Sequence, residues 1–187
     1  MEKSPLRYDF INIDKLSFVL VVFGLYEYSI GYDLNSQGNH TQAIQYYNKA
    51  LAIDPKYTNA LNGIGDALDN LGNHTQAIQY YNKALAIDPK NTYALNGKGF
   101  SLAELGKYNE GLVFIDKALS LDPKNAEALD SKGFTLDGLG RHNEAIALYN
   151  KALAIDPKNT DALKAKSVAI AALNNQTRLA NHTTTLK

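Results

Sequence analysis

The stretch GNHTQAIQYYNKALAIDPK occupies residues 38–56 and recurs without a change at residues 72–90. The two copies start 34 residues apart. The same interval separates four of the five prolines, which are Pro55, Pro89, Pro123 and Pro157. A fixed period of this length predicts a repeat architecture, in which every unit is one supersecondary element and stacked units share a core.

Small residues recur at fixed positions when the units are aligned so that this proline is position 32. Position 8 is always glycine, at Gly31, Gly65, Gly99 and Gly133. Position 15 is also always glycine, at Gly38, Gly72, Gly106 and Gly140. The position-15 glycine is predicted to adopt a positive φ where the first helix of the unit ends.

Apolar residues inside a unit follow a helical period. In the third unit these are Leu95, Leu102 and Leu105, followed by Leu112, Ile115 and Leu119. Each unit is therefore predicted to be a helical hairpin, whose second helix ends at the Asp-Pro pair. Capping side chains are expected at Thr58, Thr92 and Thr160 for the first helices, and at Thr41, Thr75, Asn109 and Asn143 for the second.

These features resemble the tetratricopeptide repeat, a 34-residue unit with small residues at positions 8, 20 and 27 and proline at position 32. The resemblance implies an all-α fold, a right-handed α-solenoid of stacked antiparallel helix-turn-helix repeats. The sequence departs from the family at position 11, where Leu34, Leu68, Leu102 and Leu136 replace the usual tyrosine. We expect the packing to tolerate this change.

The repeat frame divides the whole chain. The expected divisions are an N-terminal apolar segment at 1–23, four repeats at 24–57, 58–91, 92–125 and 126–159, a capping helix at 160–174 and a flexible polar tail at 175–187. The N-terminal segment is expected to be helical and to pack on the first repeat. A polar outer face on the last helix is what a terminal repeat needs.

The resemblance implies that positions 2, 5, 9, 12 and 13 of the first helices line a concave groove. Acidic and aromatic residues dominate these positions, with asparagines between them. The candidate groove residues are Tyr28, Tyr32, Asn62, Asp66, Asp69, Tyr93, Asn96, Phe100, Glu127, Asp130, Phe134 and Asp137. Aromatic anchors among carboxylates suit a peptide that carries apolar and basic side chains. The alternative is that the acids are only a solvated helix face.

Composition excludes several other partners and chemistries. The 19 basic residues balance 19 acidic ones, whereas a nucleic-acid-binding domain is expected to be strongly basic. Some family members bind the carboxylate-terminated tails of chaperones through lysine, asparagine and arginine, and this groove lacks those basic residues. The absence of cysteine excludes disulfides, cysteine-ligated zinc and a thiol nucleophile.

Histidine recurs at position 17, as His40, His74 and His142. We expect these rings to pack in the hairpin turns. Equivalent positions of different repeats are separated by helix layers, and each layer is roughly 8–10 Å thick. Ligands of one metal ion would need nitrogens about 2 Å from it. With no catalytic motif or phosphate-binding loop either, the sequence predicts no metal, no cofactor and no enzymatic activity.

Residues 16–26 are apolar except for Ser17 and Gly24. This run is shorter than the roughly 20 residues of a membrane-spanning helix. We expect a helix that starts near Asp14, in a cytoplasmic protein. Membrane association, or self-association that buries Phe18, Leu20 and Val22, are the alternatives.

The sequence therefore predicts a non-enzymatic scaffold that binds a basic and apolar peptide segment of another protein. The rival hypothesis is an assembly element that self-associates or attaches to a membrane through the N-terminal segment.

Overall fold

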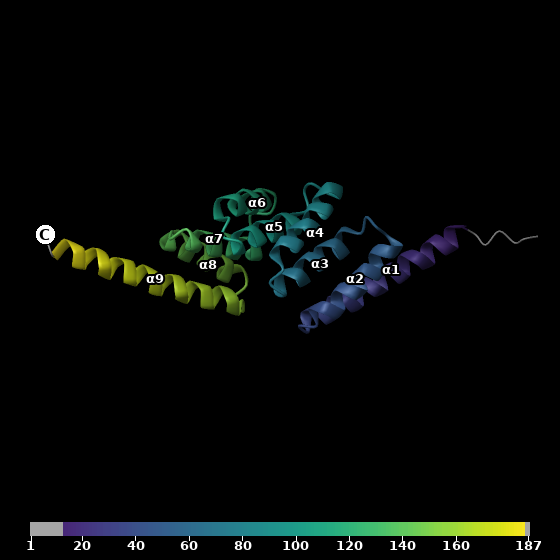
Figure 1. Ribbon diagram of the computed structural model, residues 1–187, viewed down its shortest axis with the longest axis horizontal. Helices are drawn as coiled ribbons and strands as arrows, with labels where there is room; N and C mark the ends of the chain where they lie inside the picture. Colours follow the sequence, from purple (N-terminus) through teal and green to yellow (C-terminus); the bar gives the residue numbers. More distant parts are fainter. Residues whose placement is uncertain (1–12, 186–187) are drawn as a thin grey trace, which may run out of the picture.

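The computed structural model describes the backbone of residues 13–185 and the side chains of residues 18–179. Within these limits the chain is a linear stack of helices, as Figure 1 shows. The helices are α1 (Ile13–Ser36), α2 (His40–Ile53), α3 (Thr58–Asn70), α4 (His74–Ile87), α5 (Thr92–Glu104), α6 (Tyr108–Leu121), α7 (Ala126–Gly138), α8 (His142–Ile155) and α9 (Thr160–Thr185). The predicted all-α stack of helix-turn-helix units is confirmed.

The position-15 glycines end the first helix of each unit with a left-handed residue. Gly38, Gly72, Gly106 and Gly140 have φ values of 82°, 75°, 74° and 75°, which confirms the prediction. In the third unit the N–H of Gly106 donates to Ala103 O and the N–H of Lys107 donates to Leu102 O. These bonds satisfy carbonyls that the end of a helix would otherwise leave free.

The predicted threonine caps are wrong. Asn91, Asn125 and Asn159 cap α5, α7 and α9, since each side-chain oxygen accepts a backbone N–H three residues later at 2.9 Å. The threonine that follows Asn91 or Asn159 already lies inside the helix. The second helices begin at position 17 without a side-chain cap bond.

Tyrosine rings join the first unit to the second and the second unit to the third. Tyr47, Tyr81 and Tyr149, at position 24, are at most 2% exposed, as expected for core residues. A Cβ atom on Gly63 of α3 would lie 2.5 Å from the Tyr47 ring, and one on Gly97 of α5 would overlap the Tyr81 ring. Glycine at these two positions lets the ring of one unit pack against the first helix of the following unit.

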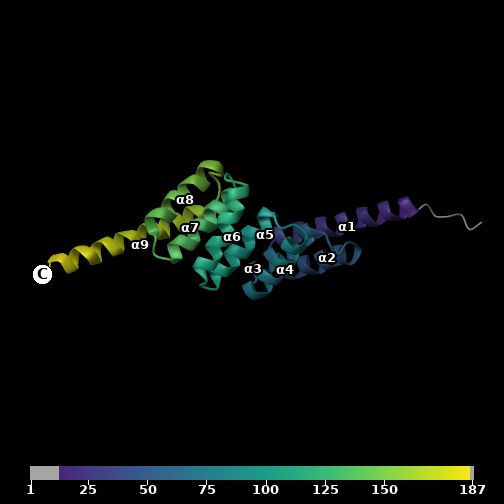
Figure 2. The same cartoon turned by 90° about the horizontal axis from the view of Figure 1, so that it is seen from above.

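The two ends of the stack differ from the inner units. α1 is one continuous helix, and its first half projects from the array in Figures 1 and 2. The apolar side chains from Phe18 to Phe23 are exposed, whereas Gly24 is buried beside Ile53. None of the helices in the described part of the chain has an apolar run long enough to cross a membrane. Residues 1–12 of the predicted N-terminal segment lie outside the described residues.

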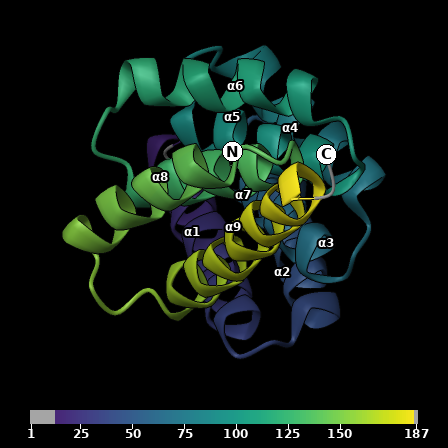
Figure 3. The same ribbon diagram turned by 90° about the vertical axis from the view of Figure 1, so that its left-hand side faces the viewer.

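At the other end, α9 covers the last unit and continues to Thr185, beyond the expected end at Asn174. Its Ala169 packs into a cluster with Leu136, Ala145 and Tyr149. Residues 186–187 of the predicted tail lie outside the described residues. Seen end-on in Figure 3, α6 and α8 lie at the rim of the stack, while α7 and α9 lie nearer its axis.

Candidate functional site

The first helices of successive units face a shared groove of about 670 Å³, which runs from α3 across α5 and α7 to α9. Seven of the predicted residues line it: Asp66, Asp69, Asn96, Phe100, Glu127, Asp130 and Phe134. Asp161 and Ala165 of α9 close its far end. Asp137 does not line the groove.

A smaller hollow of about 180 Å³, which we call the tyrosine hollow, lies between α1 and α3. It contains the remaining candidates Tyr28, Tyr32, Asn62 and Tyr93, and it shares Asp66 with the groove. Tyr28 packs against Tyr57 and Tyr47, with ring centroids 5.1 Å and 5.7 Å apart. Tyr32 is 59% exposed and gives the hollow an aromatic rim.

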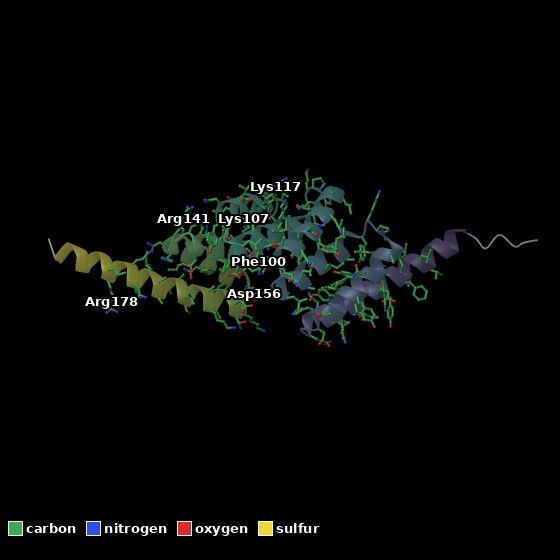
Figure 4. The ribbon with its side chains drawn as sticks, viewed as in Figure 1. Phe100, Lys107, Lys117, Arg141, Asp156 and Arg178 are labelled. Carbon is green, nitrogen blue, oxygen red and sulfur yellow. The ribbon has the colours of Figure 1, made fainter. Side chains whose placement is uncertain are left out.

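Phe100 of α5 and Phe134 of α7 form an aromatic pair in the groove. Their ring centroids lie 5.5 Å apart and the planes are tilted by 46°, within the range that aromatic pairs prefer. Both side chains remain partly exposed. In Figure 4 Phe100 lies near the middle of the array.

Hydrogen bonds within the array occupy Asp66 and Asp69. Asp66 accepts from the side-chain amide of Asn35 at 2.5 Å and from the Tyr93 hydroxyl. Asp69 accepts from Ser101 Oγ at 2.8 Å and from the Tyr81 hydroxyl at 3.1 Å. Burial raises the pKa of both carboxyls, and these hydrogen bonds partly offset the rise. The two aspartates therefore link neighbouring units.

A contact between positions 12 and 17 recurs in the hairpin turns. The Nδ1 atoms of His40, His74 and His142 lie 2.7, 2.9 and 2.5 Å from oxygens of Asn35, Asp69 and Asp137, respectively. This pairing was not predicted from the sequence, although the sequence indicates it: the residues at positions 12 and 17 change together in the third unit. In the third unit position 17 is Tyr108, and position 12 is Ala103, which has no polar side chain to pair.

The carboxylates at the α7–α9 end of the groove are not satisfied in the same way. Burial and the nearby Asp161 raise the pKa of Asp130 to about 6. Partial loss of hydration raises the pKa of Glu127, and Asp66 and Asp130 raise it further. Among the ion pairs of the described residues, none joins Glu127 or Asp130 to a basic side chain.

The groove can therefore accept hydrogen bonds and stack against flat groups, but it offers few donors. Within the described residues, no three histidine or acidic side chains converge as ligands of one metal ion. The buried oxygens Asn96 Oδ1 and Asp130 Oδ1 of the groove have no hydrogen-bond donor on the protein, and the same is true of Asn62 Oδ1 in the tyrosine hollow. This arrangement suits a ligand that brings its own N–H donors and positive charge.

Two family models match the sequence. A tetratricopeptide repeat model matches residues 24–90, and the model of the psidin N-terminal TPR repeats region matches residues 58–183. The second match covers more than half of the chain. No curated protein matches the sequence.

Solved structures share the fold. TTC0263, a thermophilic TPR protein in Thermus thermophilus, matches with a TM-score of 0.68 and 22% identity over 78% of this chain and 80% of that one. MamA 41-end from Desulfovibrio magneticus RS-1 matches with a TM-score of 0.60 and 20% identity over 85% of this chain and 96% of that one. The first TPR domain of human RPAP3 matches with a TM-score of 0.60 and 22% identity over 66% of this chain and 98% of that one. At these identities the likeness establishes the fold alone.

Proposed function

The chain belongs to the tetratricopeptide-repeat family, and from that premise we propose that it is a scaffold that binds a peptide segment of another protein in the groove. The proposal assigns no catalytic role to the groove. The observation that carries it is the partly exposed Phe100–Phe134 pair, which lies in the groove with Glu127 and Asp130, two carboxylates that form no ion pair with a basic side chain of the described residues. The ligand it favours is a segment with both apolar and basic side chains.

Aromatic side chains that are partly exposed in a concave surface are typical binding anchors, because a partner can bury them at a small cost in side-chain entropy. The surrounding carboxylates attract a basic partner and disfavour an acidic one. A chaperone tail that ends in a carboxylate does not suit this groove for the same reason.

The proposal is tested by incubating the full chain with an unbiased peptide array at physiological salt. We expect selective capture of peptides that combine basic and apolar residues. Capture of acidic peptides, or a blank array, would contradict the proposed ligand class.

The exposed apolar surface of α1 favours a second function, self-association. Phe18, Val22 and Tyr26 lie one turn apart on the side of the helix opposite Gly24, and they are 69%, 47% and 62% exposed. Exposed side chains of this size offer on the order of 100 Å² each. With their neighbours Val19 and Phe23 they give several hundred Å², the scale of one side of a standard dimer interface, about 800 Å².

Self-association is tested by sedimentation of the full chain over a range of concentrations. We expect a dimer that Val22→Lys converts to a monomer and that Val113→Lys, a change at an exposed valine on α6, leaves intact. A wild-type chain that stays monomeric at all concentrations would contradict this second function. If that monomer also floats with neutral phosphatidylcholine vesicles, the apolar surface of α1 binds a membrane instead.

A further inference from the structure

Two buried oxygens at the α5–α7 contact lack a hydrogen-bond donor. Asn96 is 3% exposed, and its side-chain amide donates to Glu127 Oε1 at 3.2 Å. An ionised carboxylate only accepts hydrogen bonds, so this contact fixes which end of the Asn96 amide is nitrogen. Asn96 Oδ1 is then left without a donor, as is Asp130 Oδ1 one unit further along. Buried acceptors without donors are unfavourable, and a water molecule or a ligand that supplies the missing donor removes the cost.

Negative charge gathers at the same end of the groove. Asp130 interacts unfavourably with Asp161 of α9, and Glu127 does so with Asp130. Lys164 contacts only the outer carboxylate: its ammonium lies 3.5 Å from Asp161, and both side chains are mostly exposed. These carboxylates do not converge on a single point as metal ligands would. A cation that spans several ångströms and carries several donors matches them better than a metal ion does.

The Phe100–Phe134 pair supplies the third feature, a flat aromatic surface in the same groove. A guanidinium group is planar, stacks on aromatic rings and presents five N–H donors in a rigid fork. An ammonium group is compact and strongly hydrated, and it gains less from such a surface.

We propose that Asn96, Phe100, Glu127, Asp130, Phe134 and Asp161 form a pocket for one arginine side chain of the bound peptide. We call this set the arginine pocket. It deepens the proposed function and rests on it, because it names the side chain that the groove selects. The aromatic pair stacks on the guanidinium, and the amide oxygen and carboxylates accept its donors. Asp66 and Asp69 take no part, since their acceptors already bind groups of neighbouring units.

The test uses the pentapeptide acetyl-Ala-Leu-Arg-Leu-Ala-amide and two analogues, in which citrulline or lysine replaces arginine. Citrulline keeps the shape of arginine and removes the charge. Binding to the full chain is measured by NMR titration at neutral pH, which detects weak affinities. We expect the citrulline peptide to bind about tenfold more weakly, and the lysine peptide to fall between the two.

The variants Asp130→Asn and Glu110→Gln locate the effect. Asp130→Asn is expected to weaken the arginine peptide about tenfold and to leave the citrulline peptide unchanged, which is the coupling expected of a direct contact. Glu110 lies in α6, outside the groove, so Glu110→Gln removes one negative charge without touching the pocket. It should change neither affinity.

Equal binding of the arginine and citrulline peptides would overturn the arginine pocket. So would an equal loss for both peptides in Asp130→Asn, or no binding of the arginine peptide. The proposed groove fails separately, if the peptide array captures nothing.

Discussion

Asp69 and Asp130 are both groove carboxylates, yet their surroundings differ. Asp69 accepts hydrogen bonds from Ser101 and Tyr81 and contacts His74, so it holds two units together. Asp130 has one buried oxygen without a donor and a like charge nearby. Binding sites commonly contain such unfavourable groups, which lower stability until a partner satisfies them. We therefore expect changes at Asp69 to lower stability, and changes at Asp130 to weaken binding while raising the stability of the free protein.

Asp130→Asn should stabilise the free protein at pH 7.5. The pKa of Asp130 is raised from 3.8 to about 6, so the folded chain holds this proton more tightly than the unfolded chain does. The corresponding stability is present below pH 3.8 and is lost as the pH rises through about 6. Asparagine removes that loss, and the thermal midpoint should rise by about 2–4 °C at pH 7.5, the effect of about 1 kcal/mol in a chain of this size.

At pH 3 the same variant and the wild type should melt at nearly the same temperature, because Asp130 is then mostly protonated in both the folded and the unfolded chain. Thermal melts followed by circular dichroism at both pH values check this. A lower midpoint for Asp130→Asn at pH 7.5 would show that the ionised carboxylate stabilises the fold, contrary to the account of the site.

Gly97→Ala should destabilise the stack, whereas Gly24→Ala should not. The added Cβ at Gly97 would overlap the buried Tyr81 ring, and overpacking of this kind costs about 1–3 kcal/mol. At Gly24 the nearest atom, Ile53 Cγ2, would lie 3.4 Å away, which is ordinary contact. Alanine there should gain up to about 1 kcal/mol from its higher helix propensity. Urea unfolding of the two variants measures the difference, and equal stabilities would contradict the packing described.

At the scale of the elements, the sequence was informative where a single residue fixes the backbone. The position-15 glycines marked every hairpin turn, because only glycine adopts a positive φ without strain. The end of α9 could not be predicted in this way. After Pro157 the chain contains neither proline nor glycine, so no residue beyond Asn174 stops the helix.

Two truncations test how much each part of α9 contributes to stability. Removal of residues 175–187 should change the thermal midpoint by less than about 2 °C, because side chains 175–179 are exposed. Removal of residues 160–187 should lower stability by several kcal/mol, since it uncovers Leu136 and Tyr149 and each uncovered side chain costs about 1.5–3 kcal/mol. A large loss from the shorter truncation would mean that the end of α9 packs on the array.

At the scale of the whole molecule, the resemblance placed the groove but could not rank its carboxylates. Asp66 and Asp69 bind side chains that lie 31 and 32 residues away in the chain, on neighbouring units. Those contacts depend on how one layer is rotated over the next, which a column of repeat positions does not encode. The third unit also differs from the others at position 12, where Ala103 has no polar side chain. Its Ser101 hydroxyl donates a hydrogen bond to Asp69 of the second unit.

The central claim is that the groove, through its aromatic pair, binds a peptide of a partner. The most direct measurement is calorimetric titration of the tightest array peptide into the wild type, Phe100→Ala and Val113→Ala. The account predicts that Phe100→Ala weakens binding by about 1–3 kcal/mol, roughly 5- to 150-fold, while Val113→Ala, outside the groove on α6, leaves it unchanged. Equal affinities for all three proteins would contradict the claim and place the binding surface elsewhere on the array.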